Sequence, residues 1–202
     1  TSDTLIKPAE PAVAVSPGSS VQTENGMDQA ALAGMGIYID SDQQEKFTEI
    51  ETPLIHVKIS NRGGGKIYDY SLNRYNKLDK SPVKIIDEEL QNGYDIQFLS
   101  AQGQSHKIQL NQFYFYTENE REKVSIEENG SFSMSYYISY NERRIEKKIT
   151  FYGNRYHVDL QFIVSDPQGL FLNKEYQLIW KNGLPANEEN RVEDYSYSEI
   201  YA

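Results

Sequence analysis

The stretch FSMSYYISY, residues Phe132–Tyr140, alternates large side chains with serine. One face of an extended chain here would carry the serines at positions 133, 135 and 139. The opposite face would carry Phe132, Met134, Tyr136, Ile138 and Tyr140. Alternation with a period of two is typical of a strand that buries one face. The stretch therefore predicts a β-strand lying against a hydrophobic core.

The same alternation recurs elsewhere in the chain. Ile55, Val57 and Ile59 would share a face opposite His56 and Lys58. In YHVDLQFIV the expected inward set is Tyr156, Val158, Leu160, Phe162 and Val164. Turn-forming pairs separate the runs at positions 92–93, 129–130, 153–154, 166–167 and 182–183. We predict an all-β fold, an antiparallel β-sandwich with no helix beyond a short turn near residues 87–90.

Composition narrows the classes of partner. The 202 residues carry a formal charge of -10, which argues against nucleic acid and, less strongly, against anionic lipid. Sixteen tyrosines and eight phenylalanines suit pleated sheets. The chain has no cysteine, which excludes disulfides and thiolate metal sites. No apolar run approaches the roughly 20 residues that span a bilayer, so the sequence as written predicts a soluble chain.

Residues 1–45 differ in composition from the rest. They mix Pro, Ala, Ser and Gly with scattered charge and show no sustained period. Such a segment buries too little apolar area to offset its ordering entropy, so we predict a flexible tether followed by a sandwich domain over residues 46–202. A leader left after processing, or an overhang from expression, is the alternative interpretation.

Three glycines and a lysine, Gly63-Gly64-Gly65-Lys66, invite comparison with phosphate-binding loops. A P-loop needs Ser or Thr after the lysine, where this chain has Ile67, and glycine where it has Ser60. A dinucleotide-binding motif starting at Gly63 would need glycine at Tyr68. We predict that the glycines supply positive φ or a bulge in a hairpin and hold no nucleotide.

We assign no catalytic, cofactor-binding or metal-ligating residue from the sequence. His56, His106 and His157 lack the spacing of metal motifs, and we interpret them as solvated. Adjacent carboxylates at 88–89, 127–128 and 188–189 fall in polar, turn-like stretches. The triplet at 129–131 matches a glycosylation acceptor but lies in an expected tight turn.

A small basic cluster, Arg143-Arg144 and Lys147-Lys148, is interleaved with Glu142 and Glu146. This pattern favours an ion-paired strand, or lysines that protect a sheet edge, over a nucleic-acid surface.

The order of motifs from Phe47 to Leu184 resembles the periplasmic domain of the bacterial membrane protein insertase YidC, the Bacteroidetes form in particular. IETPLIHVKISNRGGGKIYDYSLNRY resembles the family's opening strands and glycine turn, with Asn61, Gly63, Gly64, Leu72 and Tyr75 in matching places. SPVKIIDEE resembles a short segment that follows. IEKKITFYGNRYHVDLQFIVSD resembles its paired strands through Lys147, Phe151, Tyr156 and Val158, and YQLIWKNGL resembles its Trp-x-x-Gly-Leu turn.

The resemblance implies a β-supersandwich on the periplasmic side of the inner membrane. It also implies a transmembrane helix before the tether, and further strands and an insertase core after EDYSYSEIYA, so we expect a sandwich that is incomplete at its C-terminus. No active residue of that core transfers to these positions. In some family members this domain contacts accessory proteins of the Sec translocon.

Three functions stay open at this point. The first is an interaction module of an insertase and chaperone for membrane proteins, with Sec translocon components and nascent membrane proteins as partners and no chemistry of its own. The second is a carbohydrate-binding or mutarotase-like domain that uses Tyr68, Tyr70 and Tyr137. The third is a surface lipoprotein. Unpaired edges near the C-terminus predict self-association through strands, or local disorder.

Overall fold

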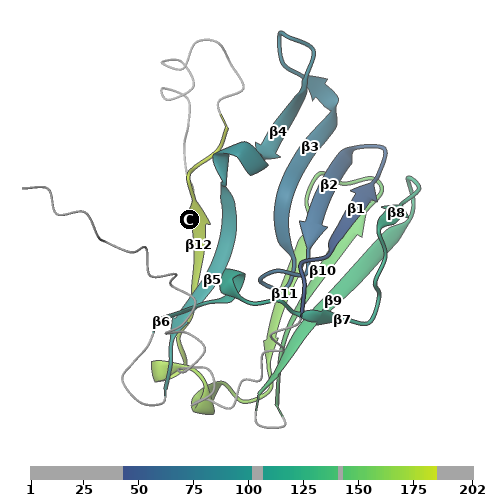
Figure 1. Cartoon of the computed structure of the whole chain (residues 1–202). Helices are drawn as coiled ribbons and strands as arrows, with labels where there is room; N and C mark the ends of the chain where they lie inside the picture. The colour runs from purple at the N-terminus through teal and green to yellow at the C-terminus, as the bar shows by residue number, and fades with distance from the viewer. Residues whose placement is uncertain (1–42, 102–106, 141–142, 186–202) are drawn as a thin grey trace, which may run out of the picture.

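The protein folds as packed β-sheets. The structure, a computed structural model, describes residues 43–101, 107–140 and 143–185. Its strands form three sheets, which confirms the predicted all-β sandwich (Figure 1). Helical structure in these ranges is limited to short 3-10 turns: η1 (Glu88–Leu90), η2 (Leu110–Gln112), η3 (Pro167–Gly169) and η4 (Leu172–Lys174).

The first sheet has five strands in the order β4-β3-β2-β1-β8. They are β1 (Phe47–Glu51), β2 (Ile55–Ser60), β3 (Lys66–Asn76), β4 (Pro82–Ile86) and β8 (Lys123–Ser125). Sequential strands pair antiparallel as hairpins, as predicted. The pairing of β1 with β8 is parallel, an exception that alternation along either strand does not encode.

The second sheet has four strands in the order β11-β10-β9-β7. They are β7 (Tyr116–Thr117), β9 (Ser131–Tyr140), β10 (Arg143–Tyr152) and β11 (Asp159–Val164). The stretch that predicted the fold is therefore β9, which pairs antiparallel with β10 along its whole length. Met134, Tyr136 and Ile138 are buried as expected.

The third sheet contains β5 (Gly93–Leu99), β6 (Lys107–Gln109) and β12 (Gln177–Lys181) in the order β12-β5-β6. Aromatic contacts join it to the second sheet: the rings of Phe98 and Phe171 lie 4.6 Å apart, and those of Phe162 and Phe171 6.3 Å apart. In Figure 1 this sheet stands beside the other two, with β12 on its outer side.

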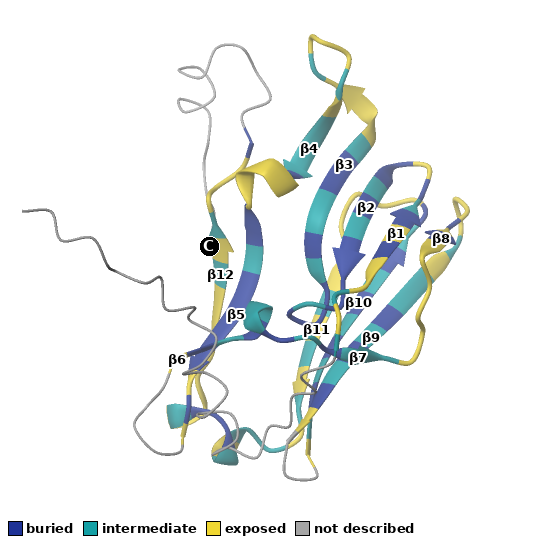
Figure 2. Ribbon diagram, viewed as in Figure 1, coloured by how far each residue is buried: buried dark blue, intermediate teal, exposed yellow. Residues whose placement is uncertain are grey.

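Burial follows the predicted alternation with one exception. Ile55, Val57 and Ile59 are buried, and Leu160 and Phe162 are half-buried against the core. Tyr156, expected to point inward, is 37% exposed because it lies in the connection before β11 and packs against Tyr75 instead. Figure 2 shows buried and exposed residues alternating along the strands.

The domain boundaries stay predictions. The expected tether reaches residue 45, and its last described part contacts the sandwich: the Gln43 amide donates to the Phe115 carbonyl (3.0 Å), and Glu45 accepts from Ser60 (2.8 Å). Residues 1–42, and the C-terminal residues on which the expected incompleteness depends, lie outside the described ranges.

Candidate functional site

The glycine run forms the turn between β2 and β3, as predicted. Gly63, Gly64 and Gly65 have φ values of +61°, +68° and +95°. A register shift after Lys58 adds a bulge beside the turn. Lys66 opens a strand, whereas a phosphate-binding loop opens a helix.

The backbone of this turn is already engaged by the protein. The amide of Gly63 donates to the Phe113 carbonyl (2.7 Å), and that of Gly64 to the Asn61 carbonyl (3.2 Å). A Cβ added at Gly65 would lie 2.4 Å from the Ile149 side chain, so the turn packs directly on the second sheet. The glycines thus permit close approach of protein to protein.

Lys147 points into the core beneath this turn. Its side chain is fully buried, its ammonium donates to the Gly63 carbonyl (2.7 Å), and it lies 4.8 Å from the centre of the Tyr94 ring. Burial lowers the pKa of Lys147 from 10.5 to about 7, and the nearby Asp95 carboxylate opposes that shift. The Tyr94 hydroxyl donates to the Gly65 carbonyl (2.9 Å), so two side chains from different sheets hold one turn.

The prediction that Lys147 protects a sheet edge is wrong. Strand β10 lies between β9 and β11, and its inward side carries Lys147 among Ile145 and Ile149. The predicted ion pairing of this strand is confirmed for its two arginines: Arg143 pairs with Asp166 (2.8 Å) and Arg144 with Glu146 (3.4 Å).

Asp95 forms the other charged contact at the junction of the sheets. It is fully buried on β5 and accepts from the ammonium of Lys181 on β12 (2.9 Å) and from the backbone amide of Asn111 (3.2 Å). Lys147, Tyr94, Asp95 and Lys181 together tie all three sheets near the glycine turn. Each of these groups has a structural contact within the fold.

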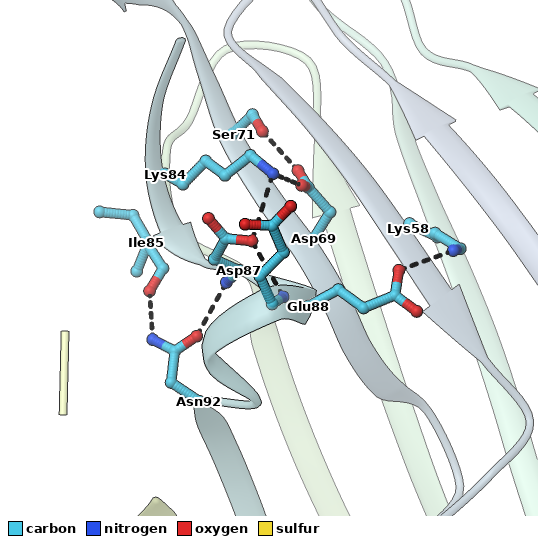
Figure 3. A network of polar contacts seen from close by, with 9 residues as sticks. Lys58, Asp69, Ser71, Lys84, Ile85, Asp87, Glu88 and Asn92 are labelled. Carbon is cyan, nitrogen blue, oxygen red and sulfur yellow. Dashed lines mark hydrogen bonds and ion pairs between the residues drawn. The ribbon is translucent and has the colours of Figure 1, made fainter. Parts of the chain in front are cut away.

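A second polar network joins β4 and η1 to β3 and β2 (Figure 3). Lys84 pairs with Asp69 (2.6 Å) and with Asp87 (3.5 Å). Glu88 pairs with Lys58 on β2 (2.9 Å), so this member of the 88–89 carboxylate pair is used in an ion pair.

Asn92 completes this network from the start of β5. Its carbonyl oxygen accepts from the Asp87 amide (2.8 Å), and its amide donates to the carbonyls of Ile85 (3.0 Å) and Gly183 (2.9 Å). One buried side chain therefore joins β4, η1 and the turn after β12.

The histidines do not converge within the described part of the chain. His56 contacts Glu51 (2.7 Å), and His157 lies 4.0 Å from Asp159 and is largely exposed. Across residues 43–101, 107–140 and 143–185, no group of three or more His, Cys, Asp or Glu side chains could hold a metal ion. His106 falls outside these ranges.

The tyrosines expected to stack on sugars have other roles. Tyr70 is buried, contrary to that expectation, because it lies opposite the buried Val57 on the core side of β3; its hydroxyl donates to the Tyr156 carbonyl. Tyr68 is half-buried and donates to Glu45 (2.7 Å). The ring of Tyr137 is covered by the guanidinium of Arg144 at 3.7 Å.

The clearest candidate for a contact surface is the apolar edge, defined here as Tyr176, Leu178, Trp180 and Leu184. Leu178 and Trp180 pair with Ile96 and Tyr94 and so lie on the core side of the third sheet. Ile96 is 1% exposed, whereas Leu178 is 62% and Trp180 45% exposed. The apolar face of the third sheet thus continues from β5 onto β12, but the side chains that cover it over β5 do not extend over Leu178 and Trp180. Within the described ranges only β5 pairs with β12.

A pocket of about 280 Å³ lies at one end of this edge. Phe98, Leu172 and Tyr176 contribute apolar walls, and Gln97 and Gln177 contribute amides. The Gln97 amide donates to Gln177 (2.6 Å), so these polar groups already satisfy one another.

Comparison with known sequences shows to which protein family this chain belongs. The model of the YidC periplasmic domain family matches residues 48–201. The chain belongs to this family. The predicted resemblance to this family is thereby confirmed, and membership places the domain on the periplasmic side of the bacterial inner membrane.

Similar full-length proteins carry one name, "Membrane protein insertase YidC". The protein from Chlorobium luteolum is 24% identical over 88% of this chain and 29% of its own length. Those from Pelodictyon phaeoclathratiforme and Chlorobium limicola are 22% and 24% identical over 93% and 90% of this chain. The chain spans about three tenths of the length of these curated relatives.

These findings favour the insertase among the three functions considered from the sequence, and no observation favours the carbohydrate or lipoprotein alternatives. In the described ranges of this YidC periplasmic domain, no helix is both long enough and apolar enough to cross a bilayer.

Proposed function

We propose that this chain is the interaction module of a membrane protein insertase and chaperone, with no chemistry of its own. Its family and the name shared by its relatives support the insertase. The charged groups at the sheet junction support a structural role there, since Lys147 and Asp95 are both committed to contacts within the fold.

The observation that carries the interaction role is the apolar edge on β12. An edge strand offers unpaired backbone donors and acceptors, and proteins usually protect such edges with charge or short length. Here the edge presents Leu178 and Trp180 instead. An extended segment can add to such a strand through main-chain hydrogen bonds and place alternate side chains on its apolar face.

The partners follow from this proposal. Nascent membrane proteins supply extended apolar segments, and components of the Sec translocon are the second expected class. Residues 1–45 would serve as a tether from a membrane anchor, and residues 46–202 as the head that meets these partners. Self-association through the same edge is a competing use of the surface.

The experiment is photo-crosslinking in the full-length parent protein, with a photoreactive amino acid at Trp180. The matched control places the same amino acid at Leu90, which is 47% exposed on η1 compared with 45% for Trp180. We expect crosslinks to translocon subunits or nascent chains from position 180 and few from position 90. If removal of residues 47–202 left every co-purified partner bound, the interaction role would be wrong.

A further inference from the structure

The β3–β4 hairpin projects from the sandwich as an isolated two-stranded arm. The last contact of β3 with the β2 side is the hydrogen bond from the Asn73 amide to the Leu54 carbonyl (2.8 Å). Beyond it, Asn73–Asn76 continue the strand, and β4 is the only strand that pairs with them in the described ranges. The pairing is irregular here: Leu72 lies opposite Val83 and Asn76 opposite Pro82, so the β3 residues between them bulge. Figures 1 and 2 show this arm with an exposed tip.

The arm displays two large side chains, Leu78 on its turn and Tyr75 on β3 just before the turn. Leu78 is 75% exposed, the highest value among the large hydrophobic residues described, and Tyr75 is 53% exposed. The turn is closed by the Lys80 amide, which donates to the Lys77 carbonyl (3.0 Å). Asp79 accepts from both the amide (2.8 Å) and the hydroxyl (2.6 Å) of Ser81. Leu78 is therefore held outward by a fixed turn.

The base of the arm is braced by the connection between β10 and β11. The rings of Tyr75 and Tyr156 lie 5.7 Å apart, and the Tyr70 hydroxyl donates to the Tyr156 carbonyl. These contacts fix the direction in which the arm projects.

The charge of the tip opposes that of the whole protein. Residues 74–81 carry three basic side chains, Arg74, Lys77 and Lys80, and one acidic side chain, Asp79, whereas the whole chain has a net charge of -10. At physiological ionic strength charges farther apart than about 8 Å are largely screened. Because the tip projects from the sheets and carries three basic side chains against one acidic side chain, it acts as a local cationic surface. The net charge of the whole chain, which argued against binding to anionic lipid, therefore does not describe the local charge of the tip.

We propose that the β3–β4 tip docks on an anionic phospholipid surface. The leucine enters the boundary of the acyl chains, Tyr75 sits at headgroup level, and the three basic side chains pair with lipid phosphates. A protein interface of ordinary stability buries more than about 1,000 Å², far more than one turn presents. A membrane needs no matching pocket, so the small apolar and basic tip suits lipid better than an acidic protein.

The lipid proposal rests on the proposed function in one respect only, namely that a membrane lies near this domain. The test needs no insertase activity: the 202-residue chain is mixed with vesicles and bound protein is measured by flotation. One vesicle contains equal parts of phosphatidylglycerol and phosphatidylcholine, and the other phosphatidylcholine alone. We expect binding to the first that weakens with added salt. Failure here leaves the crosslinking test of the apolar edge untouched.

The double variant Lys77→Ser/Lys80→Asn tests the charge. Each lysine removed near an anionic surface lowers partitioning about fivefold. The matched control, Lys107→Ser/Lys174→Asn, changes net charge equally, and Lys174 has φ +61° against +67° for Lys80. We expect the control to bind like the wild-type chain.

Leu78→Ser tests insertion, with Leu90→Ser as its control, because Leu90 is 47% exposed on η1 and lies outside both the tip and the apolar edge. We expect loss of binding from the first variant only. Equal losses in test and control variants would overturn the proposal, as would absence of vesicle binding. A polyglutamate peptide that bound the tip while vesicles did not would assign the surface to an acidic protein segment and also overturn it.

Discussion

Replacing Lys147 by methionine removes the buried ammonium at the sheet junction and keeps a side chain of similar length. Burial lowers the pKa of Lys147 from 10.5 to about 7 in the folded protein. Between these two values the unfolded chain holds a proton that the folded chain has released. The free energy of unfolding of the wild-type protein therefore rises with pH across this window. Below about pH 7 both states are protonated and the cost of burying the charge is present in full.

The magnitude follows from linkage. Between pH 7 and about pH 9 the Lys147 contribution becomes more favourable by about 2 kcal/mol. The Lys147→Met chain has no such group, so its free energy of unfolding should lack this rise. Urea denaturation of both chains at the two pH values measures the difference directly. Lys148→Met is the control, because Lys148 lies on the opposite face of the same strand and is only half-buried.

The buried amine can also be observed on its own. A carbon-13 spectrum of the lysine Cε atoms should show one signal that titrates near pH 7 and disappears in the methionine variant. Parallel pH profiles for the wild-type and Lys147→Met chains would refute the reasoning, as would titration of every lysine in the ordinary range.

Three further predictions use the same denaturation assay. Gly65→Ala should lower the free energy of unfolding by about 3 kcal/mol, since φ is +95° and a Cβ would meet the Ile149 side chain at 2.4 Å. Gly183→Ala, at φ +64° with open space around it, should cost about 1 kcal/mol, and equal costs would contradict this explanation. Asn92→Ala should cost about 3 kcal/mol because three hydrogen bonds are lost, and a neutral result would mean that water replaces them. Lys181→Met should cost about 3 kcal/mol by leaving the Asp95 carboxylate buried without its ion pair, and a neutral result would show that the Asn111 amide suffices.

Alternation along the chain predicted the strands and most of the core. It worked for β2, β9 and β11 because each has one covered and one wetter face, which is the condition that produces a period of two. The glycine turn was predictable for a similar reason, since a run of glycines between two alternating segments has few other uses.

Other features depend on contacts between segments distant in the sequence. The parallel pairing of β1 with β8 and the division into three sheets leave no local pattern. Tyr156 continues the alternation of β11 but lies before the strand begins, so its exposure is decided by Tyr75, 81 positions earlier.

The burial of Lys147 did leave a signal in the sequence. It shares a period-two face with Ile145, Ile149 and Phe151, and this spacing indicates burial despite the charged neighbours of Lys147. The burial of Asp95 left none, because the carboxylate is covered by β12, which follows more than eighty residues later.

Keeping a lysine in this core has a consequence for strand register. An apolar side chain at position 147 would be satisfied in many environments, but a buried ammonium needs an acceptor, and here it is the Gly63 carbonyl. A slip of β10 by one residue would turn Ile145 and Ile149 out of the core, and in one direction it would place the Glu146 carboxylate against that carbonyl. The cost of burying one charge therefore selects a single arrangement of β10 against the glycine turn. With that arrangement fixed, the third sheet is held through Tyr94 at the position from which β12 presents its apolar edge.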